Sequence, residues 1–419
     1  MDLHKPEALR MDTNIRIESE VGTLRTVLLH RPGRELESLT PQYLDSMLFE
    51  DIPFLDQMQV EHDQFAQLLK SQGCTVRYIE ELLETVLVSE DIRQSVIAYL
   101  LESSQLFSPA LKQSIGEYLG MLSVNQLATC CIGGLLKSAV NSEVQHSSLS
   151  YHIRDAYPYY ISPLPNLYFT RDPATVVGSS VAVHTMKNES RRRESWLFSL
   201  IAQHHPLFAT RRVFTDYSHG NSIEGGDILM IDRGCAAVGS SARTGTWAIE
   251  AFARLMTRPI ECGGEGLDEV LVIQIPYTRA YMHLDTVFTM VDRDAFSIYG
   301  KIAPLLKVFS IKSGPKDDLI IREERSLKST LERVLAIPSV RLIPSGGPDR
   351  IVAEREQWND STNTLAIAPG KVITYRRNII SNETLEHHGI TVLPIPGSEL
   401  VRGRGGPRCM SMPLFREAL

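Results

Sequence analysis

The 419-residue sequence lacks a long hydrophobic run. A membrane-spanning helix needs about 18 or more consecutive apolar residues, so we expect no membrane span. The first 14 residues contain no apolar run after their charged residues, which argues against a secretion signal. We therefore expect a cytoplasmic protein that has no membrane partner.

An excess of positive charge is also missing. The 43 lysines and arginines are outnumbered by 50 aspartates and glutamates, so the formal net charge is −7. Proteins that bind nucleic acid or anionic membranes rely on basic surfaces. The balance therefore argues against nucleic acid as a partner, and 43% hydrophobic residues are ample for a large core.

Cysteine is scarce, with six residues and no C-x-x-C spacing. A chain of this size with so few cysteines has no dense disulfide framework, and we expect reduced thiols. Cys409 differs from the other five because the twelve positions before it contain four glycines and three arginines. Glycine allows close backbone approach and arginine favours a thiolate, so this segment is typical of a loop that presents a nucleophile.

Short apolar runs occur beside turns centred near positions 32, 172, 233, 293 and 369. Strand-like runs separated by Gly, Pro and Asp predict β-hairpins, and their spacing predicts a repeated α/β module of about 60 to 75 residues. Helical periodicity in residues 92–101, 109–119 and 123–136 instead predicts a helical insertion. We expect an α/β domain formed by residues 1–84 and 151–419, with an inserted helical domain over residues 85–150.

Polar motifs lie at the edges of successive modules. His283 and Asp285 precede an apolar run and, two residues apart on a strand, would share one face. Glu224 precedes two glycines, and Asp172 is expected at the end of a short strand that begins near Asn166. If the edges converge, one Cys, one His, one Glu and two Asp would meet. The set lacks structural zinc spacing, so we expect organic catalysis with no metal and no cofactor.

Five motifs, in order along nearly the whole chain, resemble the arginine deiminase family of the guanidine-modifying pentein superfamily. They are Asn166–Pro173 with F-T-R-D-P, Ile223–Asp227 with E-G-G-D, Gly239–Thr244, His283–Asp285, and Gly397–Met412. The resemblance implies a fivefold pseudosymmetric α/β propeller of ββαβ-type units with an inserted helical bundle. It also implies hydrolysis of free L-arginine to L-citrulline and ammonia through a covalent thiouronium-type intermediate, and a homo-oligomer.

The family's roles can be transferred position by position. The resemblance implies that Cys409 is the nucleophile, that His283 is the general acid and base, and that Glu224 orients His283. It implies that Asp172 and Asp285 bind the guanidinium. The implied contacts to the rest of the substrate are Asn166, Arg191, Arg243 and Arg404, with Asn363 in a loop near the nucleophile.

One motif departs from the family, which commonly has D-G-x-N where this chain has Asp360-Ser361-Thr362-Asn363. Serine tolerates positive φ poorly, so the loop geometry is open at this point. Two alternatives also remain: another guanidine-modifying enzyme, such as an amidinotransferase or a methylarginine hydrolase, and a non-catalytic arginine-binding protein. A papain-like protease fits poorly, because Cys409 follows its histidine and lies near the chain end.

Overall fold

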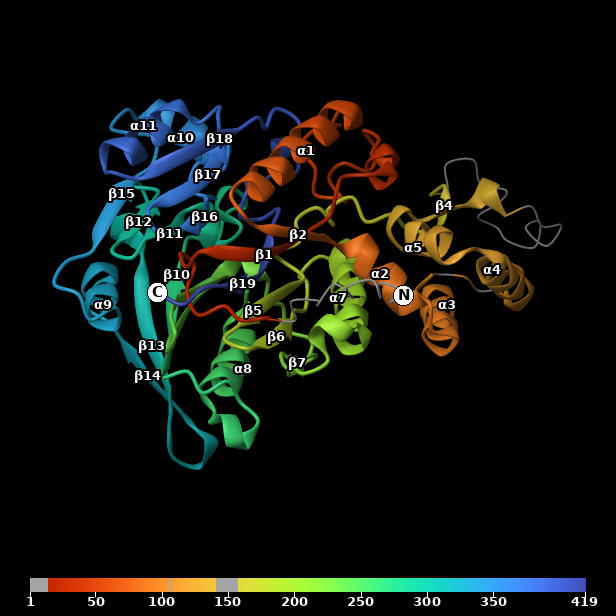
Figure 1. Cartoon of the computed structure of the whole chain (residues 1–419), viewed down its shortest axis with the longest axis horizontal. Coiled ribbons are helices and arrows are strands. Elements are labelled where there is room, and N and C mark those ends of the chain that lie inside the picture. Colours follow the sequence, from red (N-terminus) through yellow and green to blue (C-terminus); the bar gives the residue numbers. More distant parts are fainter. Residues whose placement is uncertain (1–13, 105, 107, 141–156) are drawn as a thin grey trace, which may run out of the picture.

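The computed structural model describes residues 14–104, 106, 108–140 and 157–419. Sheets and helices alternate along most of the chain (Figure 1). The strands are β1 (Leu24–Leu29), β2 (Thr75–Tyr78), β3 (Leu135–Leu136), β4 (Tyr159–Ile161), β5 (Ala174–Val177), β6 (Ser180–Val183), β7 (Val213–Phe214), β8 (Ile228–Asp232), β9 (Cys235–Ser240), β10 (Glu269–Gln274), β11 (Phe288–Asp292), β12 (Ala295–Ile298), β13 (Lys307–Ser313), β14 (Leu319–Glu323), β15 (Arg341–Pro344), β16 (Leu365–Ala368), β17 (Lys371–Tyr375), β18 (Thr391–Ile395) and β19 (Met412–Arg416). The α-helices are α1 (Leu55–Ser71), α2 (Ile79–Leu87), α3 (Glu90–Ser103), α4 (Pro109–Met121), α5 (Val124–Gly133), α7 (Arg192–His204), α8 (Thr246–Thr257), α9 (Leu327–Val334), α10 (Arg350–Trp358) and α11 (Ile379–His387).

Five sheets in the described part of the chain share one strand order. Two antiparallel strands are followed by a third strand parallel to the second: β19-β1-β2, β5-β6-β7, β8-β9-β10, β11-β12-β15 and β16-β17-β18. A parallel pair needs a crossover, and each crossover contains a helix, respectively α1, α7, α8, α9 and α11. The β13-β14 hairpin extends the third sheet. The repeated module expected from the sequence is therefore a ββαβ unit.

Three of the expected hairpins are confirmed, namely β8-β9, β11-β12 and β16-β17. The hairpin expected around position 172 is wrong, because residues 167–170 form turns and the hairpin is β5-β6, which turns at Gly178 with φ 55°. The first expected hairpin is also wrong. β1 pairs antiparallel with β19, the last strand, so one sheet joins both ends of the chain.

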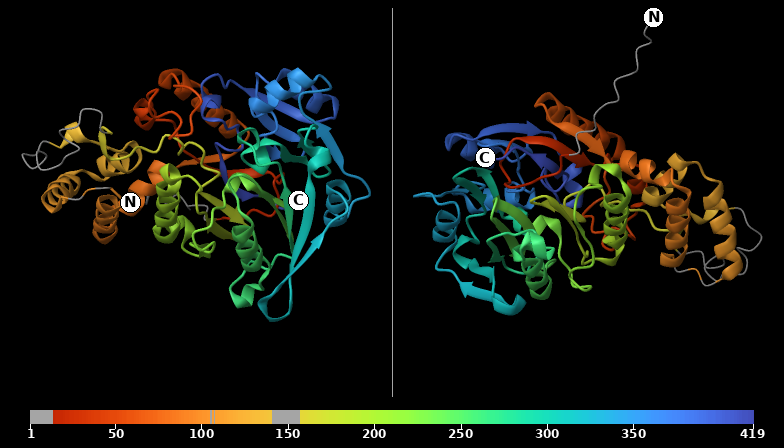
Figure 2. Two further views of the ribbon diagram at one scale, coloured as in Figure 1. Left: turned by 180° about the vertical axis from the view of Figure 1, so that it is seen from behind. Right: turned by 60° about the horizontal axis from the view of Figure 1, so that its bottom comes forward.

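The three helices expected in the insertion are confirmed as α3, α4 and α5, and α2 precedes them. Two of these helices, α4 and α5, start with recognisable caps: the Ser108 side chain accepts from Leu111 N, and Ser123 and Gln126 form a capping box. These helices lie to one side of the sheets (Figure 2). The part of the expected insertion over residues 141–150 lies outside the described residues. Among the residues described, no helix has the length and apolar character needed to cross a bilayer.

Candidate active site

The residues expected to carry the chemistry occupy equivalent positions in the five units. Each stands shortly before the first strand of a sheet: Asp172 before β5, Glu224 before β8, His283 and Asp285 before β11, Asn363 before β16, and Cys409 before β19. All six side chains are buried, with Cys409 the most exposed at 3%. The structure therefore brings together residues that are far apart in the chain, and Asp172 and Cys409 are separated by 237 positions.

The sequence suggested that His283 and Asp285 lie on a strand, but they do not. They lie at a 3-10 turn, η9 (Leu284–Thr286), and the strand begins only at Phe288. Asp227 holds this turn: its Oδ1 accepts from Leu284 N at 2.7 Å and its Oδ2 from Ser241 Oγ at 2.7 Å. Sequence reasoning did not assign a role to Asp227, although it is the last residue of the E-G-G-D motif.

His283 lies between two carboxylates. Its Nε2 is 2.7 Å from Glu224 Oε2, and its Nδ1 is 3.8 Å from Asp172 Oδ1. Burial disfavours the charged ring, but Asp172 and Glu224 outweigh it and raise the pKa of His283 to about 9. The ring is therefore protonated at neutral pH and can act as an acid.

Cys409 is held by Asn363 and Asp285. Asn363 Nδ2 lies 3.1 Å from Cys409 Sγ, and Asn363 Oδ1 accepts from Cys409 N at 2.9 Å. The thiol lies 3.6 Å from Asp285 Oδ2. Burial, followed by the charges of Asp285 and Asp172, raises the pKa of the Cys409 thiol well above its usual value. Burial and these charges therefore favour the protonated thiol, and a cation bound beside Cys409 would oppose this effect.

Asp285 has one occupied and one free oxygen. Its Oδ2 accepts from Arg408 Nη1 at 2.8 Å, whereas Oδ1 is buried without a hydrogen-bond partner in the described structure. Arg408 is in turn bound by both oxygens of Glu20, at 3.1 and 3.2 Å. Sequence reasoning missed Arg408 and Glu20. The only available signal was the position of Arg408, immediately before the nucleophile.

Asp172 is held by backbone and by one arginine. Its Oδ1 accepts from Gly226 N at 3.1 Å and its Oδ2 from Arg191 Nη1 at 2.7 Å. Arg191 also binds Glu194, with Nη2 2.8 Å from Oε2. A side chain at Gly226 would meet the His283 ring, since a Cβ there would lie 2.6 Å from Nδ1. The second glycine of E-G-G-D therefore allows His283 to approach.

The remaining expected contacts lie around this centre. Arg243 Nη1 is 3.4 Å from Glu224 Oε2, and Asn166 Nδ2 donates to Met47 O at 2.7 Å. Arg404 is 4% exposed and stacks on Trp358, with its Cζ 3.5 Å from the ring centroid. Arg404 Nε and Nη1 are buried without hydrogen-bond partners among the described residues.

The serine that replaces the family's glycine does not adopt a strained conformation. The positive φ of this loop, 59°, belongs to Asp360, and Ser361 has no positive φ. Aspartate is among the residues that tolerate this conformation best. The loop brings Asn363 to Cys409, so the departure leaves the contact with the nucleophile intact.

Asp172, Glu224 and His283 are also the group in the described chain whose ligand atoms, within 4.8 Å of one another, could hold a metal ion. Their charges already have organic partners: Asp172 pairs with Arg191, and Glu224 with Arg243 and His283. The donor set therefore fits an organic cation as well as it fits a metal.

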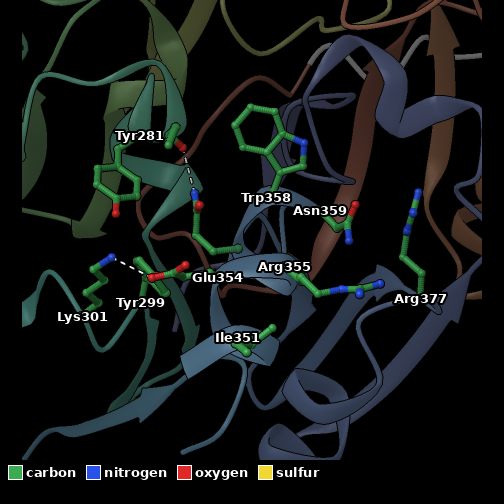
Figure 3. Close-up of a pocket in the computed structure, with 11 residues that line it drawn as sticks. Tyr281, Tyr299, Lys301, Ile351, Glu354, Arg355, Trp358, Asn359 and Arg377 are labelled. Atoms are coloured by element: carbon green, nitrogen blue, oxygen red, sulfur yellow. Dashed lines mark hydrogen bonds and ion pairs between the residues drawn. The ribbon is translucent and has the colours of Figure 1, made fainter. Parts of the chain in front are cut away.

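Cys409 and His283 line neither of two cavities that lie beside the candidate site. A cavity of about 640 Å³ is lined by Tyr281, Lys301, Trp358 and Arg377, among others (Figure 3). A second, of about 260 Å³, shares Trp358 and is lined by Arg404. These cavities reach the far end of the site but not Cys409. The reacting groups are thus enclosed by protein in this structure.

Comparison with known proteins agrees with this geometry. The family model described as arginine deiminase matches residues 45–416. A curated arginine deiminase of Latilactobacillus sakei subsp. sakei (strain 23K) is 41% identical over 415 residues, covering 98% of this chain and 100% of the relative. One from Bacillus cytotoxicus is 44% identical over 410 residues, covering 96% and 98% of the two chains.

Solved structures share the fold at low identity. SxtG, an amidinotransferase from Microseira wollei, has a TM-score of 0.55 at 12% identity, covering 97% of this chain and 98% of that chain. Unliganded AgrE has a TM-score of 0.52 at 14% identity, covering 94% of this chain and 40% of that chain. These likenesses show a common mixed α/β fold. The family match over most of the chain and the full-length relatives establish that this chain belongs to the arginine deiminase family.

Proposed function

We propose that this protein hydrolyses free L-arginine to L-citrulline and ammonia, with Cys409 as the nucleophile. The observation that carries the proposal is that a thiol, an imidazole and two substrate-binding carboxylates lie close together. The Cys409 thiol lies 3.6 Å from Asp285, whose second oxygen is buried and unpaired, and His283 lies between Asp172 and Glu224. A planar cation placed there would meet two carboxylates, a thiol and a proton donor.

The guanidinium of arginine supplies the matching cation. It is planar, always charged, and offers N–H groups that carboxylates bind in pairs. In the proposed complex Asp172 and Asp285 hold the N–H groups and place the central carbon against Cys409. The arriving positive charge opposes the acidic groups that raise the pKa of the thiol, so substrate binding itself favours the thiolate.

The reaction then needs only these side chains and water. Cys409, having lost its proton to solvent, attacks the central carbon, and His283 gives a proton to the departing ammonia. This leaves a thiouronium cation on Cys409 and a neutral His283. His283 takes a proton from water as the water attacks the same carbon. The neutral adduct then breaks its C–S bond and releases citrulline and the thiolate, and its hydroxyl proton passes through solvent to the released ammonia, which becomes ammonium. Glu224 keeps the ring oriented and supports its charge.

Citrulline release from L-arginine by the purified protein tests the proposal directly. Agmatine and a methylated arginine, supplied separately, test for related guanidine-modifying activities. Turnover of one of these without turnover of L-arginine would contradict the proposal. Binding of L-arginine without release of citrulline would instead indicate an arginine-binding protein.

The pH dependence of kcat/KM should report the proton on His283. Because its pKa is raised to about 9, the acid form is present below that pH and is lost above it. We expect kcat/KM to fall as pH rises through about 9. Glu224→Gln removes one of the carboxylates that raise this pKa, so the falling limb of the profile should move to lower pH. An unchanged limb would contradict the assignment of His283.

Loss of Arg404 should reveal the carboxylate site. Its unpaired Nε and Nη1 fit the α-carboxylate of free arginine, and agmatine lacks that group. Arg404→Gln should lower kcat/KM for L-arginine by about 10- to 150-fold, which corresponds to the free energy of one hydrogen bond between charged groups. It should change agmatine turnover little. Arg322→Gln, on strand β14, serves as the control. Equal losses with both substrates would contradict a role in carboxylate recognition.

The arrangement of the five units and the domain boundaries are part of the same proposal. We infer that the five ββαβ units close into a fivefold α/β propeller, with residues 1–84 and 151–419 forming it and residues 85–150 inserted as a helical domain. Contacts between strands of different units support this arrangement: β19 contacts β5, β11 contacts β16, and β1 contacts β16. Arg191, Arg243, Arg404 and Asn166 are assigned to the amino-acid end of the substrate. The homo-oligomer expected from the family stays a prediction.

A further inference from the structure

Three side chains of the proposed site bury polar atoms that have no hydrogen-bond partner in the described structure. They are Asp285 with Oδ1, Arg404 with Nε and Nη1, and Asp360 with both carboxylate oxygens. Buried polar groups are almost always paired, and leaving one unpaired costs free energy. Such atoms indicate where polar groups of a substrate can bind. The functional assignments above use Asp285 and Arg404 but leave Asp360 without a role.

Asp360 lies in the loop between α10 and β16, in the middle of a short segment that touches both ends of the site. Two residues before it, the Trp358 ring covers Arg404 at 3.5 Å, and three residues after it, Asn363 Nδ2 lies 3.1 Å from Cys409 Sγ. Figure 3 shows Trp358 and Asn359, the residues that lead into Asp360, beside the open cavity. The loop thus runs from the carboxylate-binding arginine to the nucleophile.

The burial and raised pKa of Asp360 fit a carboxyl that can bind a cationic group. The residue is 2% exposed, and burial raises the pKa of its carboxyl to about 7, with Arg404 acting in the opposite direction. Its positive φ of 59° is a conformation that aspartate tolerates better than most residues, so the residue type fits the loop. An unpaired, buried carboxyl held in this way has no evident value for stability alone.

Free L-arginine carries one further cation besides the guanidinium. Its α-ammonium is attached to the same carbon as its α-carboxylate, so an acceptor for it must lie near Arg404. We propose that Asp360 accepts the α-ammonium group of the substrate, next to the α-carboxylate that Arg404 binds. This inference rests on the proposed function. Arg404 and Asp360 together would recognise the zwitterion, and a peptide or an N-acylated arginine would leave Asp360 buried and unpaired.

The test compares L-arginine with 5-guanidinopentanoate, which keeps the guanidinium and the carboxylate but lacks the α-amino group. Asp360→Asn is the variant, because asparagine has the same shape, tolerates positive φ and removes the charge. We expect its affinity for L-arginine, measured by calorimetry, and its kcat/KM to fall about 10- to 150-fold. Both quantities should change less than about threefold for 5-guanidinopentanoate. The wild type itself should prefer L-arginine by a comparable factor.

Asp318→Asn, in an exposed position beside β14, is the matched control and should behave as wild type. Equal losses with both ligands would mean that Asp360 acts through Arg404 or the loop, which overturns the inference, as would no loss with either. A wild type that binds both ligands equally would overturn it without any variant. Failure of the wild type to release citrulline would contradict the proposed function, and the binding comparison would still decide the role of Asp360.

Discussion

Cys409→Ala should abolish citrulline release while leaving L-arginine binding in place. In the proposed reaction the thiol forms the covalent bond between enzyme and substrate. Without it, water would have to attack the guanidinium directly, which is very slow. We expect kcat to fall by a factor on the order of 10⁴ or more. The carboxylates of Asp172 and Asp285 remain, so calorimetry should still detect L-arginine binding. Citrulline formation measures the loss, and intact-protein mass should show an adduct in rapidly quenched wild type only.

The exposed thiol of Cys262 provides the control, because Cys262→Ala removes a sulfur outside the site. Its activity should match the wild type. If Cys409→Ala retained substantial turnover, Cys409 would not be the nucleophile. If Cys409→Ala lost L-arginine binding together with activity, the site would have collapsed, and Cys409→Ser, which is closer in size, would then replace it.

His283→Ala should cause the second largest loss. In the proposed reaction the ring supplies the proton for departing ammonia and later accepts one from water, so the variant should slow both halves of the reaction. General acid and base catalysis contributes about 10² to 10⁴ in rate, and we expect a fall in kcat of that order or larger. Asp172 and Asp285, the carboxylates proposed to bind the guanidinium, remain in the variant, so the KM for L-arginine should change much less than kcat.

His387→Ala on helix α11 controls for the loss of a histidine, because His387 is exposed and its Nδ1 donates to Glu383 O within the same helix. Steady-state citrulline kinetics measure both variants. A fall in kcat/KM of less than tenfold for His283→Ala would assign the proton transfers to another group. Thermal unfolding should accompany the assay, since a buried ring leaves a cavity.

The nature of the site could be predicted from the sequence because its residues stand in short motifs with distinctive neighbours. Cys409 follows a run of glycines and arginines, and Glu224 precedes two glycines that leave room for other groups, as Gly226 does for His283. The repeated α/β module was also predicted, because strand hairpins and amphipathic helices each leave a periodicity in the local sequence. The ββαβ order of its elements followed only from the resemblance to the family. Three of the five hairpins were correct for this reason.

The errors have physical causes. The apolar run at residues 167–170 is buried like a strand but forms turns, because its side chains pack inward beside the C-terminal loop, where Tyr168 Oη donates to Leu400 O at 3.1 Å. His283 and Asp285 converge through a 3-10 turn held by Asp227, a contact between segments 57 residues apart. Local periodicity carries no information about either.

By itself the sequence predicted the repeating α/β modules, the helices α3, α4 and α5, and the thiol, imidazole and carboxylates of the candidate site. Only the tertiary structure decided how these groups are charged and which of their atoms are free. The raised pKa of His283, the buried Arg408 that occupies one oxygen of Asp285, and the unpaired carboxyl of Asp360 each depend on segments that are distant in the chain. Desolvation and charge pairing act through space, so they emerge only when the five units meet.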